Sequence, residues 1–397
     1  MKFAIISPVL PPSPSGQAVV LYKLLQDIPS DDFIVISTRD YHKKCRDSCT
    51  ERFNSEYFYM PGLHILFKQF ILITNFFGVK IFLRAYLNKR ASDYTKILAK
   101  NGCQLAIVCT ADLFEPDAVC SACKKLQIPL YFYIFDDYIL QWHNRSELKF
   151  AGETGPLVIK NAEKVIVANE CLKREYHKRY GIESDVIHNP VNMDFYKRPG
   201  NSGFSSTNLR IVYTGDVGEA HYDAFRNMIS ALKLINRRDV KLHIYTGRRK
   251  ARLVKERITG PFVVIHPHQS ITSIPDIQEN ADILFLPLAF RSKYPDFIID
   301  SASPGKMGEY LAAGRAILVH APAGSFVSWY FKKNNCGIVV DSTRVEDLAG
   351  AIRQLLEDRS LRQNLGDAAK SAADRDFNLD RIRSQFRRIV YENQTTR

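Results

Sequence analysis

Short apolar runs alternate with longer amphipathic segments through the first half of the chain. The runs are Phe3 to Ile6, Phe33 to Ile36, Leu105 to Cys109, Leu130 to Phe135 and Val165 to Ala168. Each is separated from the next by enough residues for a helix, and strands that alternate with helices favour a doubly wound parallel sheet. A further short strand is expected at 185–191, where DVIHNPV leads toward the end of this half.

The same alternation returns in the second half. Its apolar runs are Leu209 to Tyr213, Val240 to Tyr245, Phe262 to Ile265, Ile283 to Leu286 and Ala316 to Val319. The segment KRPGNSGFSSTN at 197–208 resists regular structure, because it is rich in Pro, Gly, Ser and Asn. We predict α/β domains at 1–198 and 209–375, a linker at 199–208, and a last helix at 376–397.

The bulk composition fits a globular protein with an anionic partner. The chain has 397 residues, 46% hydrophobic and 24% charged, which suffices for two separate cores. A net charge of +13 favours nucleic acid, an anionic membrane or a phosphorylated substrate, and no zinc-finger or RNA-binding signature supports nucleic acid. We therefore expect no nucleic-acid partner.

The cysteines and the N-terminus favour a cytoplasmic protein. Eight cysteines are scattered along the chain, and the first apolar run is too short for a secretory signal. Cys120 and Cys123 form one C-x-x-C, but no second pair completes a zinc site, so one buried helix face is favoured over metal or redox use. No metal site is expected.

Residues 61–90 combine dense apolar and aromatic residues with Lys and Arg. A bilayer span needs roughly 20 mostly apolar residues, and Lys68 and Lys80 interrupt this one. Two interpretations stay open. The segment is either an interfacial helix on the inner face of a membrane, suited to a lipid-linked acceptor, or a set of helices buried against their own sheet.

The segment Ser301 to Ala316, SASPGKMGEYLAAGRA, is the leading candidate for a binding site. Pro304 and Gly305 suit the start of a helix, whose free N–H groups and dipole favour an anion, and Lys306 adds a positive charge there. Glu309, one turn further on, is placed to accept hydrogen bonds from sugar hydroxyls. The alternative is an ordinary surface helix in which Glu309 pairs with Lys306.

This segment resembles the donor-binding segment of retaining GT-B glycosyltransferases, especially family 4-like enzymes. The resemblance is carried by P-x-K-x-x-E-Y-x-A-A-G, the apolar strand after it, Gly324-Ser325 and Cys336-Gly337. It implies two Rossmann-like domains facing each other across a cleft, a UDP- or GDP-sugar donor on the second domain, and a glycan or lipid-linked acceptor on the first. No cofactor or metal is implied beyond the donor substrate.

The resemblance also assigns roles to individual residues. Lys306 and the helix N-terminus would hold the diphosphate, and Glu309 would contact the ribose. The donor-binding candidates that follow are Gly16, Gly215, His266, Ser303, Pro304, Gly305, Lys306, Met307 and Glu309. The family commonly has a second glutamate eight positions earlier, where this chain has Ser301 with Asp300 beside it, so contacts to the sugar are less well supported than contacts to the nucleotide.

Two other groups of polar residues follow predicted strands. Asp136 and Asp137 come after YFYIF, where a carboxylate would act as a base or orient an acceptor hydroxyl; the alternative is a pair of helix caps before Tyr138 to Leu140. His188 lies at the end of DVIH and is an acceptor or cleft candidate. The run from Arg248 to Lys250 follows another strand, where it either assists the phosphate site or simply begins a solvated helix.

The sequence thus predicts a glycosyltransferase that moves a sugar from a nucleotide donor to a glycan or lipid-linked acceptor in cell-surface polysaccharide or glycoconjugate synthesis. Lys306 and Glu309 are the main candidates for the reaction, with Asp136 as the candidate on the acceptor side. A GT-B nucleotide-sugar epimerase and a non-catalytic carbohydrate- or nucleotide-binding subunit remain as alternatives.

Overall fold

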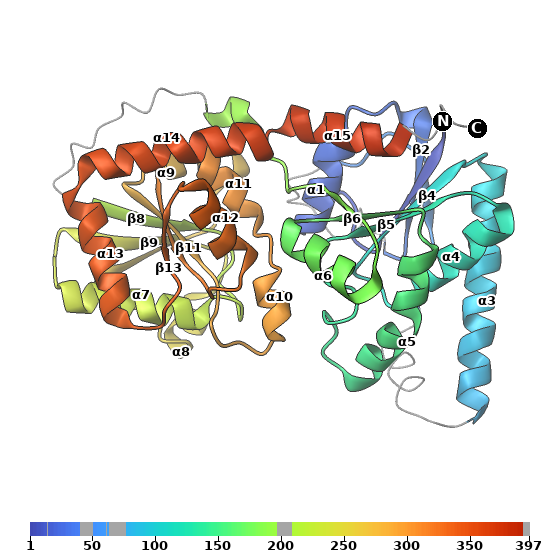
Figure 1. Cartoon of the computed structure of the whole chain (residues 1–397), viewed down its shortest axis with the longest axis horizontal. Helices are drawn as coiled ribbons and strands as arrows, with labels where there is room; N and C mark the ends of the chain where they lie inside the picture. The colour runs from blue at the N-terminus through green and yellow to red at the C-terminus, as the bar shows by residue number, and fades with distance from the viewer. Residues whose placement is uncertain (14, 40–50, 61, 63–76, 197–208, 392–397) are drawn as a thin grey trace. The chain divides into compact units, whose positions relative to one another are not determined.

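The computed structural model describes the chain except residues 14, 40–50, 61, 63–76, 197–208 and 392–397. Two compact units share the chain (Figure 1). One consists of Met1–His188 together with the residues from Arg383, and the other of Asn189–Ile382. The predicted linker at 199–208 lies outside the described residues.

The N-terminal unit is built on a seven-stranded parallel sheet of order β3-β2-β1-β4-β5-β6-β7. Its strands are β1 (Phe3–Ile6), β2 (Phe33–Ser37), β3 (Tyr57–Tyr59), β4 (Leu105–Cys109), β5 (Leu130–Ile134), β6 (Lys164–Val167) and β7 (Asp185–Val186). The five predicted apolar runs are confirmed as strands. The strand predicted at 185–191 is wrong beyond Val186, and the short edge strand β3 was not predicted.

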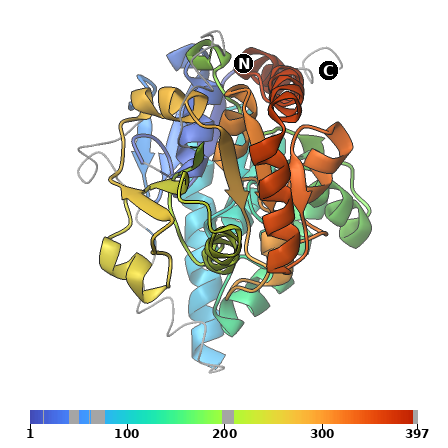
Figure 2. The ribbon, with the colours of Figure 1, turned by 90° about the vertical axis from the view of Figure 1, so that its left-hand side faces the viewer.

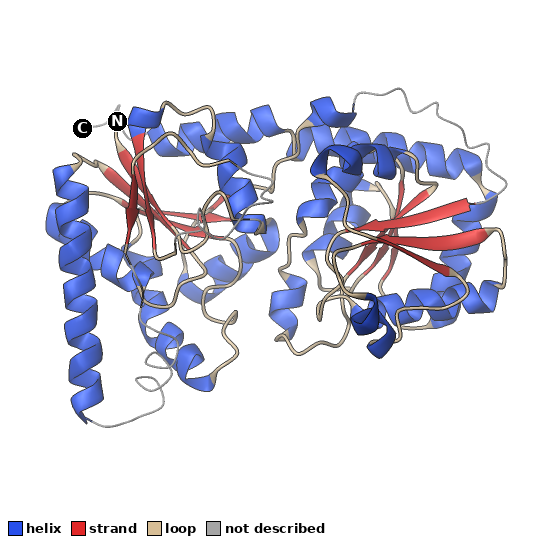
Figure 3. Cartoon of the chain, turned by 180° about the vertical axis from the view of Figure 1, so that it is seen from behind, coloured by secondary structure: helices blue, strands red, loops and turns tan. Residues whose placement is uncertain are grey.

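Helices and short 3-10 turns connect these strands. They are α1 (Gly16–Leu25), η1 (Ser30–Asp32), α3 (Phe77–Lys100), α4 (Glu115–Leu126), α5 (Arg145–Asn161) and α6 (Glu170–Tyr180). Figure 3 shows helices on both faces of the sheet, as expected for strands buried on both sides. Every residue of β1, β2, β4 and β5 is buried.

The long helix α3 is held to α4 at its C-terminal half. Arg90 donates to Glu115 Oε1 at 2.6 Å from Nη2, and the Tyr94 hydroxyl donates to Glu115 Oε2. All three side chains are buried, whereas Ile81 and Phe82 near the start of the helix are 56% and 43% exposed. Of the stretch 61–90, Arg90 is therefore committed to the protein interior, and the described start of α3 is open to solvent.

The C-terminal unit repeats the architecture with a six-stranded parallel sheet of order β10-β9-β8-β11-β12-β13. Its strands are β8 (Leu209–Thr214), β9 (Val240–Tyr245), β10 (Val263–His266), β11 (Ile283–Pro287), β12 (Ala316–His320) and β13 (Ile338–Val340). The five predicted runs are again confirmed, and the edge strand β13 is additional.

The remaining helices cover this sheet. They are η2 (Met193–Tyr196), α7 (Tyr222–Ile235), α8 (Lys250–Lys255), η3 (Ile271–Ser273), α9 (Ile274–Glu279), α10 (Asp296–Asp300), α11 (Gly305–Ala312), α12 (Phe326–Asn334), α13 (Val345–Glu357) and α14 (Arg359–Asp376). Helices α7 and α13 close one face around a core that includes Phe225, Leu242 and Ile352. Figure 2 shows α7 along its axis beside this sheet.

The two units do not divide at the linker but after His188, because residues 189–196 pack on the C-terminal unit. Asn189 Nδ2 donates to the Ser303 carbonyl at 2.8 Å, and the Val191 N–H donates to the Phe377 carbonyl at 2.8 Å. The last helix, α15 (Leu379–Tyr391), changes units within its length. From Arg383 onward it belongs to the N-terminal unit, where Arg383 Nε donates to the Lys23 carbonyl at 2.7 Å.

Helix α14 approaches the end of α11 closely enough to exclude any side chain at one position. A Cβ placed on Gly366 would lie 2.3 Å from the carbonyl oxygen of Gly314, which is far inside van der Waals contact. Gly314 itself has a φ of +63°, the left-handed conformation that ends a helix at glycine. The contact therefore fixes the spacing between α14 and the segment that carries Lys306 and Glu309.

Gly366→Ala should destabilise the protein, by about 1–3 kcal/mol, because the added methyl group forces backbone to move apart. Gly350→Ala in α13 is the matched control, since nothing lies within 4 Å of its added Cβ and alanine favours helix by up to about 1 kcal/mol. Denaturant unfolding of both variants measures the difference. Equal stability of the two variants would show that α14 can shift without cost.

Candidate functional site

The candidate site lies where the order of the C-terminal sheet reverses, between β8 and β11. Loops at such a point open away from each other beyond the carboxyl ends of the strands and leave room for a ligand. The loop after β8 and the loop after β11 are tied together here. Asp223, in the first turn of α7, accepts the N–H groups of Phe290 and Arg291 at 3.0 and 2.7 Å.

Gly215, directly after β8, lies against Lys306. Its φ of +120° is a conformation that side chains rarely adopt, and a Cβ there would be 3.1 Å from Cε of Lys306. The sequence candidates Gly215 and Lys306, which are far apart along the chain, are thus brought together. The glycine is required both by its backbone angle and by the lysine beside it.

Lys306 is a cation with no charged partner in contact. Its Nζ lies 4.9 Å from the centroid of the Tyr213 ring, and within the described parts of the chain it makes no hydrogen bond or ion pair. Burial lowers its pKa to about 8, although the charges of Glu309 and Asp216 act in the opposite direction. The surface pair between Lys306 and Glu309, the alternative prediction, is therefore not formed.

The start of α11 presents backbone without side-chain caps. Pro304 is its N-cap and supplies no capping side chain, and nothing lies within 4 Å of a Cβ placed on the exposed Gly305. The packing of the protein itself gives no reason for glycine at this position, so open space borders the free N–H groups. The carbonyl of Ser303 accepts a hydrogen bond from Asn189 Nδ2. The side chain of Met307 is buried.

Glu309 is oriented by a buried hydrogen-bond chain. Gln278 of α9 donates from Nε2 to Glu309 Oε2 at 3.3 Å and to the Thr214 hydroxyl at 3.0 Å, while its Oε1 accepts from the Tyr196 hydroxyl at 2.8 Å. Gln278 is fully buried. Sequence reasoning missed it, since a glutamine in a short polar helix carries no local signal of this role.

His266 is part of an aromatic stack at the edge of the sheet. Its ring lies parallel to that of Tyr245 at 4.1 Å between centroids, and its Nε2 is 3.0 Å from Nδ1 of His243. Burial lowers the pKa of His243 to about 4, so the pair is neutral near pH 7. The donor-binding candidate His266 therefore lies in a stack of aromatic rings at the end of β10.

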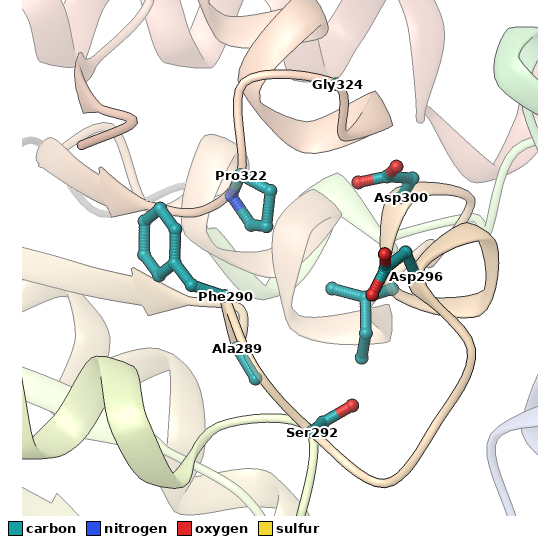
Figure 4. A pocket seen from close by; sticks show the side chains of 8 residues that line it. Ala289, Phe290, Ser292, Asp296, Asp300, Pro322 and Gly324 are labelled. Carbon is teal, nitrogen blue, oxygen red and sulfur yellow. The ribbon is translucent and has the colours of Figure 1, made fainter. Parts of the chain in front are cut away.

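A pocket of about 210 Å³ opens between α10 and the segments that follow β11 and β12 (Figure 4). Asp296 and Asp300, one turn apart on α10, line it opposite Phe290 and Pro322, and Ala289, Ser292, Ile299 and Gly324 complete it. Burial and the neighbouring charge of Asp296 raise the pKa of Asp300. A Cβ on Gly324 would lie 3.3 Å from Asp300 Oδ2, so glycine keeps this side of the carboxylate open.

Of the two neighbouring residues Asp300 and Ser301, only Asp300 lines this pocket. Ser301, at the expected spacing, is buried, and its hydroxyl donates to the Phe297 carbonyl at 2.7 Å. Helix α10 ends at Asp300, whose carboxylate faces the pocket in Figure 4. Asp300, one position before Ser301, therefore places the carboxylate at this pocket.

In the N-terminal unit the two adjacent aspartates have different environments. Asp136 is exposed just after β5, and desolvation by nearby protein together with the charge of Asp137 raises its pKa. Asp137 is fully buried, pairs with Arg179 at 2.9 Å, and accepts the N–H groups of Ile139 and Leu140. The predicted helix at 138–140 is wrong: the chain forms a turn there, which Asp137 holds.

The other candidates of this unit lie at two separate places. Gly16 is exposed at the first position of α1, with no atom within 4 Å of an added Cβ. Next to it, Gln17 donates to the Ser7 hydroxyl at 2.7 Å and to the Thr110 carbonyl at 3.2 Å, which joins the loops after β1 and β4. His188 is buried with its Nε2 3.1 Å from Glu170 Oε2.

The cysteine pair that the sequence singled out lies in the interior of the N-terminal unit. Cys120 and Cys123 are both buried in α4, and burial raises the pKa of Cys123 to about 12. Across the described residues, no three His, Cys, Asp or Glu side chains are grouped so as to hold a metal ion. No helix in the described ranges combines the length and the apolar character that crossing a membrane requires.

The chain is similar to known glycosyltransferases in part of its sequence and in its fold. Residues 208–358 match the family model described as glycosyl transferases group 1. A glycosyltransferase from Rickettsia africae superposes with a TM-score of 0.70 at 15% identity, covering 100% of this chain and 99% of its own. Among curated proteins, none matches the chain.

Two further solved structures share the fold along the whole chain. HepE of Anabaena, in complex with UDP, has a TM-score of 0.69 at 13% identity and covers 99% of this chain and 100% of its own. Sucrose-phosphate synthase from Thermosynechococcus elongatus has a TM-score of 0.67 at 13% identity and covers both chains fully. The chain therefore shares the GT-B fold of these structures, and residues 208–358 of its C-terminal unit are similar to the glycosyl transferases group 1 model.

Proposed function

We propose that the protein transfers a sugar from a nucleotide diphosphate sugar, bound by the C-terminal unit, to a glycan or lipid-linked acceptor. The observation that carries this proposal is the unpaired Lys306 beside Gly215 and the uncapped start of α11. A desolvated cation and free backbone N–H groups, preorganised at one place, stabilise the charge that develops on a departing diphosphate.

The other residues of the site supply orientation. Glu309, held by Gln278, would accept hydrogen bonds from the ribose, and the base would lie toward the His266 stack. The donor sugar would occupy the pocket beside α10, where Asp300 accepts hydrogen bonds from its hydroxyls and Phe290 covers an apolar face. UDP is the first nucleotide to test, because HepE is in complex with it.

The reaction would proceed with retention and without metal, as the family resemblance implies. On the acceptor side, Asp136 is the exposed carboxylate at the end of a central strand and would orient the acceptor hydroxyl. Asp137 and His188 would support that loop from the interior through Arg179 and Glu170. Gly16 leaves backbone accessible at the entry to α1.

Glu309→Ala should abolish stabilisation of the protein by its nucleotide donor. A ligand at 100 times its dissociation constant adds about 2.7 kcal/mol to folding, so thermal unfolding with UDP, GDP, ADP and their sugar conjugates identifies the base. Glu357→Ala, which removes an exposed glutamate at the end of α13, is the matched control. Asp300→Asn should reduce only the additional shift given by the sugar conjugate.

The outcomes of this experiment separate the alternatives. A selective shift that survives in the control and is lost in Glu309→Ala supports the donor site. Conversion of the sugar without an acceptor would instead favour an epimerase. If no nucleotide shifts the unfolding temperature of the wild type, the donor site proposed here is wrong and a non-catalytic role takes its place.

Nucleotide affinity should fall as the pH rises through about 8. Burial lowers the pKa of Lys306 to about 8, and a bound diphosphate raises it again, so the complex holds a proton that the free protein loses above this pH. Affinity is then complete below pH 8 and decreases by up to about tenfold per pH unit above it. Glu309, Asp216, Arg248 and His221 share this environment.

Lys306→Arg tests this origin directly, because arginine keeps its charge throughout the range. Dissociation constants for UDP from pH 7 to 9.5, measured by calorimetry, should decline for the wild type and stay nearly level for the variant. A wild type with constant affinity across pH 8 would show that Lys306 does not bind the diphosphate in its charged form.

We propose in addition that the start of α3 contacts an anionic membrane surface. Ile81 and Phe82 are exposed there, and Arg84 brings positive charge to the same exposed turn, whereas Lys89 pairs with Asp93 at 3.1 Å. Apolar side chains that insert at the headgroups, with basic residues beside them, are typical of peripheral binding. Arg90 is excluded from this contact by its pair with Glu115.

Flotation with vesicles of phosphatidylglycerol and phosphatidylcholine checks the membrane contact. Ile81→Ser with Phe82→Ser should reduce the floating fraction several-fold. Val254→Ser with Ile271→Ser removes two exposed apolar side chains from the C-terminal unit and should leave flotation unchanged. Equal flotation of the two double variants would remove the membrane proposal without touching the donor site.

A further inference from the structure

A second cation, Arg248, contacts the loop after β8. Arg248, from the segment between β9 and α8, forms a two-point pair with Asp216, with Nε to Oδ1 at 2.5 Å and Nη2 to Oδ2 at 2.6 Å. Its backbone N–H donates to the Thr246 hydroxyl at 3.2 Å. The guanidinium is therefore fixed in direction although it lies on the surface.

This arrangement leaves one edge of the guanidinium unused. Arginine has five N–H donors, and the pair with Asp216 uses Nε and one hydrogen of Nη2. Throughout the described residues, Nη1 of Arg248 makes no hydrogen bond or ion pair. An oxyanion can therefore be bound by Arg248 while Asp216 continues to hold it.

Lys306 and Arg248 flank the same short loop. The Cβ position of Gly215 is 3.5 Å from Lys306 Nζ, and that of Gly218 is 3.5 Å from Arg248 Nη2. Three residues of chain span at most about 11 Å between their Cα atoms, so the two cations border one small region. A diphosphate carries charge on two neighbouring phosphoryl groups, and is thus a ligand that two cations bordering one loop can bind together.

The imidazole of His221 lies close enough to both cations for each of them to lower its pKa. Burial, with the charges of Lys306 and Arg248 acting in the same direction, lowers the pKa of His221 to about 3. The neutral ring accepts the Gly218 N–H at its Nδ1. His221 therefore helps to shape the loop and adds no charge of its own.

We propose that Arg248 is a second binding residue for the donor diphosphate, supplied from the β9–α8 segment and oriented by Asp216. The inference rests on the proposed function, and it goes beyond it by naming a cation that the donor-binding pattern of this chain does not contain. An exposed ion pair contributes only about 0–1 kcal/mol to folding, so stability alone gives little reason for this pair.

Calorimetric titration with UDP and with uridine tests the role of Arg248. Arg248→Ala should weaken UDP binding at least tenfold and leave uridine binding unchanged, because only the diphosphate is contacted. Arg248→Lys should recover part of the affinity, since it restores the charge without the fixed two-point geometry. Arg249→Ala, which removes the neighbouring exposed arginine, is the matched control and should change affinity less than twofold.

The results distinguish this inference from the function on which it rests. If the wild type binds UDP and Arg248→Ala binds it as well as Arg249→Ala does, Arg248 is a surface residue and the inference is overturned alone. If the wild type binds neither UDP nor UDP-glucose, both are overturned. Unligated unfolding midpoints of the two variants should agree, which confirms that neither substitution disturbs the fold.

Discussion

The geometry of the candidate site depends on one buried hydrogen bond between a strand and a helix. The N–H of Thr214, the last residue of β8, donates to the Tyr310 hydroxyl at 2.8 Å. Tyr310 is fully buried in α11, one residue beyond Glu309 and one turn beyond Lys306. This bond sets α11 against the loop that begins at Gly215, and an unpaired buried N–H would cost about 1–3 kcal/mol, so the two elements have little freedom to separate.

Around that bond, buried hydrogen-bonded side chains support other groups that a ligand can reach. Gln278 and Tyr196 extend the network into the interior, while Lys306, Gly305 and Arg248 lie at its open end. Because the supporting groups are buried and mutually bonded, the cations and N–H groups are held in place before any ligand arrives. Such preorganisation is what allows fixed dipoles and charges to stabilise a developing anion at low cost.

Sequence reasoning located the framework well, since buried parallel strands produce continuous apolar runs that are visible without any structure. It missed β3 and β13, which are edge strands of three residues each and too short to give a pattern, and it extended β7 beyond Val186. For the candidate site, the order P-G-K followed by Glu309 already predicted the helix start with its lysine, because those residues are neighbours along the chain. Gln278 carried no local signal, and the run from Arg248 to Lys250 left two interpretations open, because the contacts of Gln278 with Glu309 and of Arg248 with Asp216 join residues 31 and 32 positions apart.

Helix α15 has a consequence for how the chain is made. Its residues Phe386, Ile389 and Val390 are buried in the unit whose strands are formed by the first 188 residues. On a ribosome that adds about 5–20 residues per second, that core stays incomplete for roughly 10 to 40 seconds while the other unit is synthesised. Of the two units, the N-terminal one thus begins to emerge first and closes last, and its sheet must stay unaggregated until α15 leaves the exit tunnel.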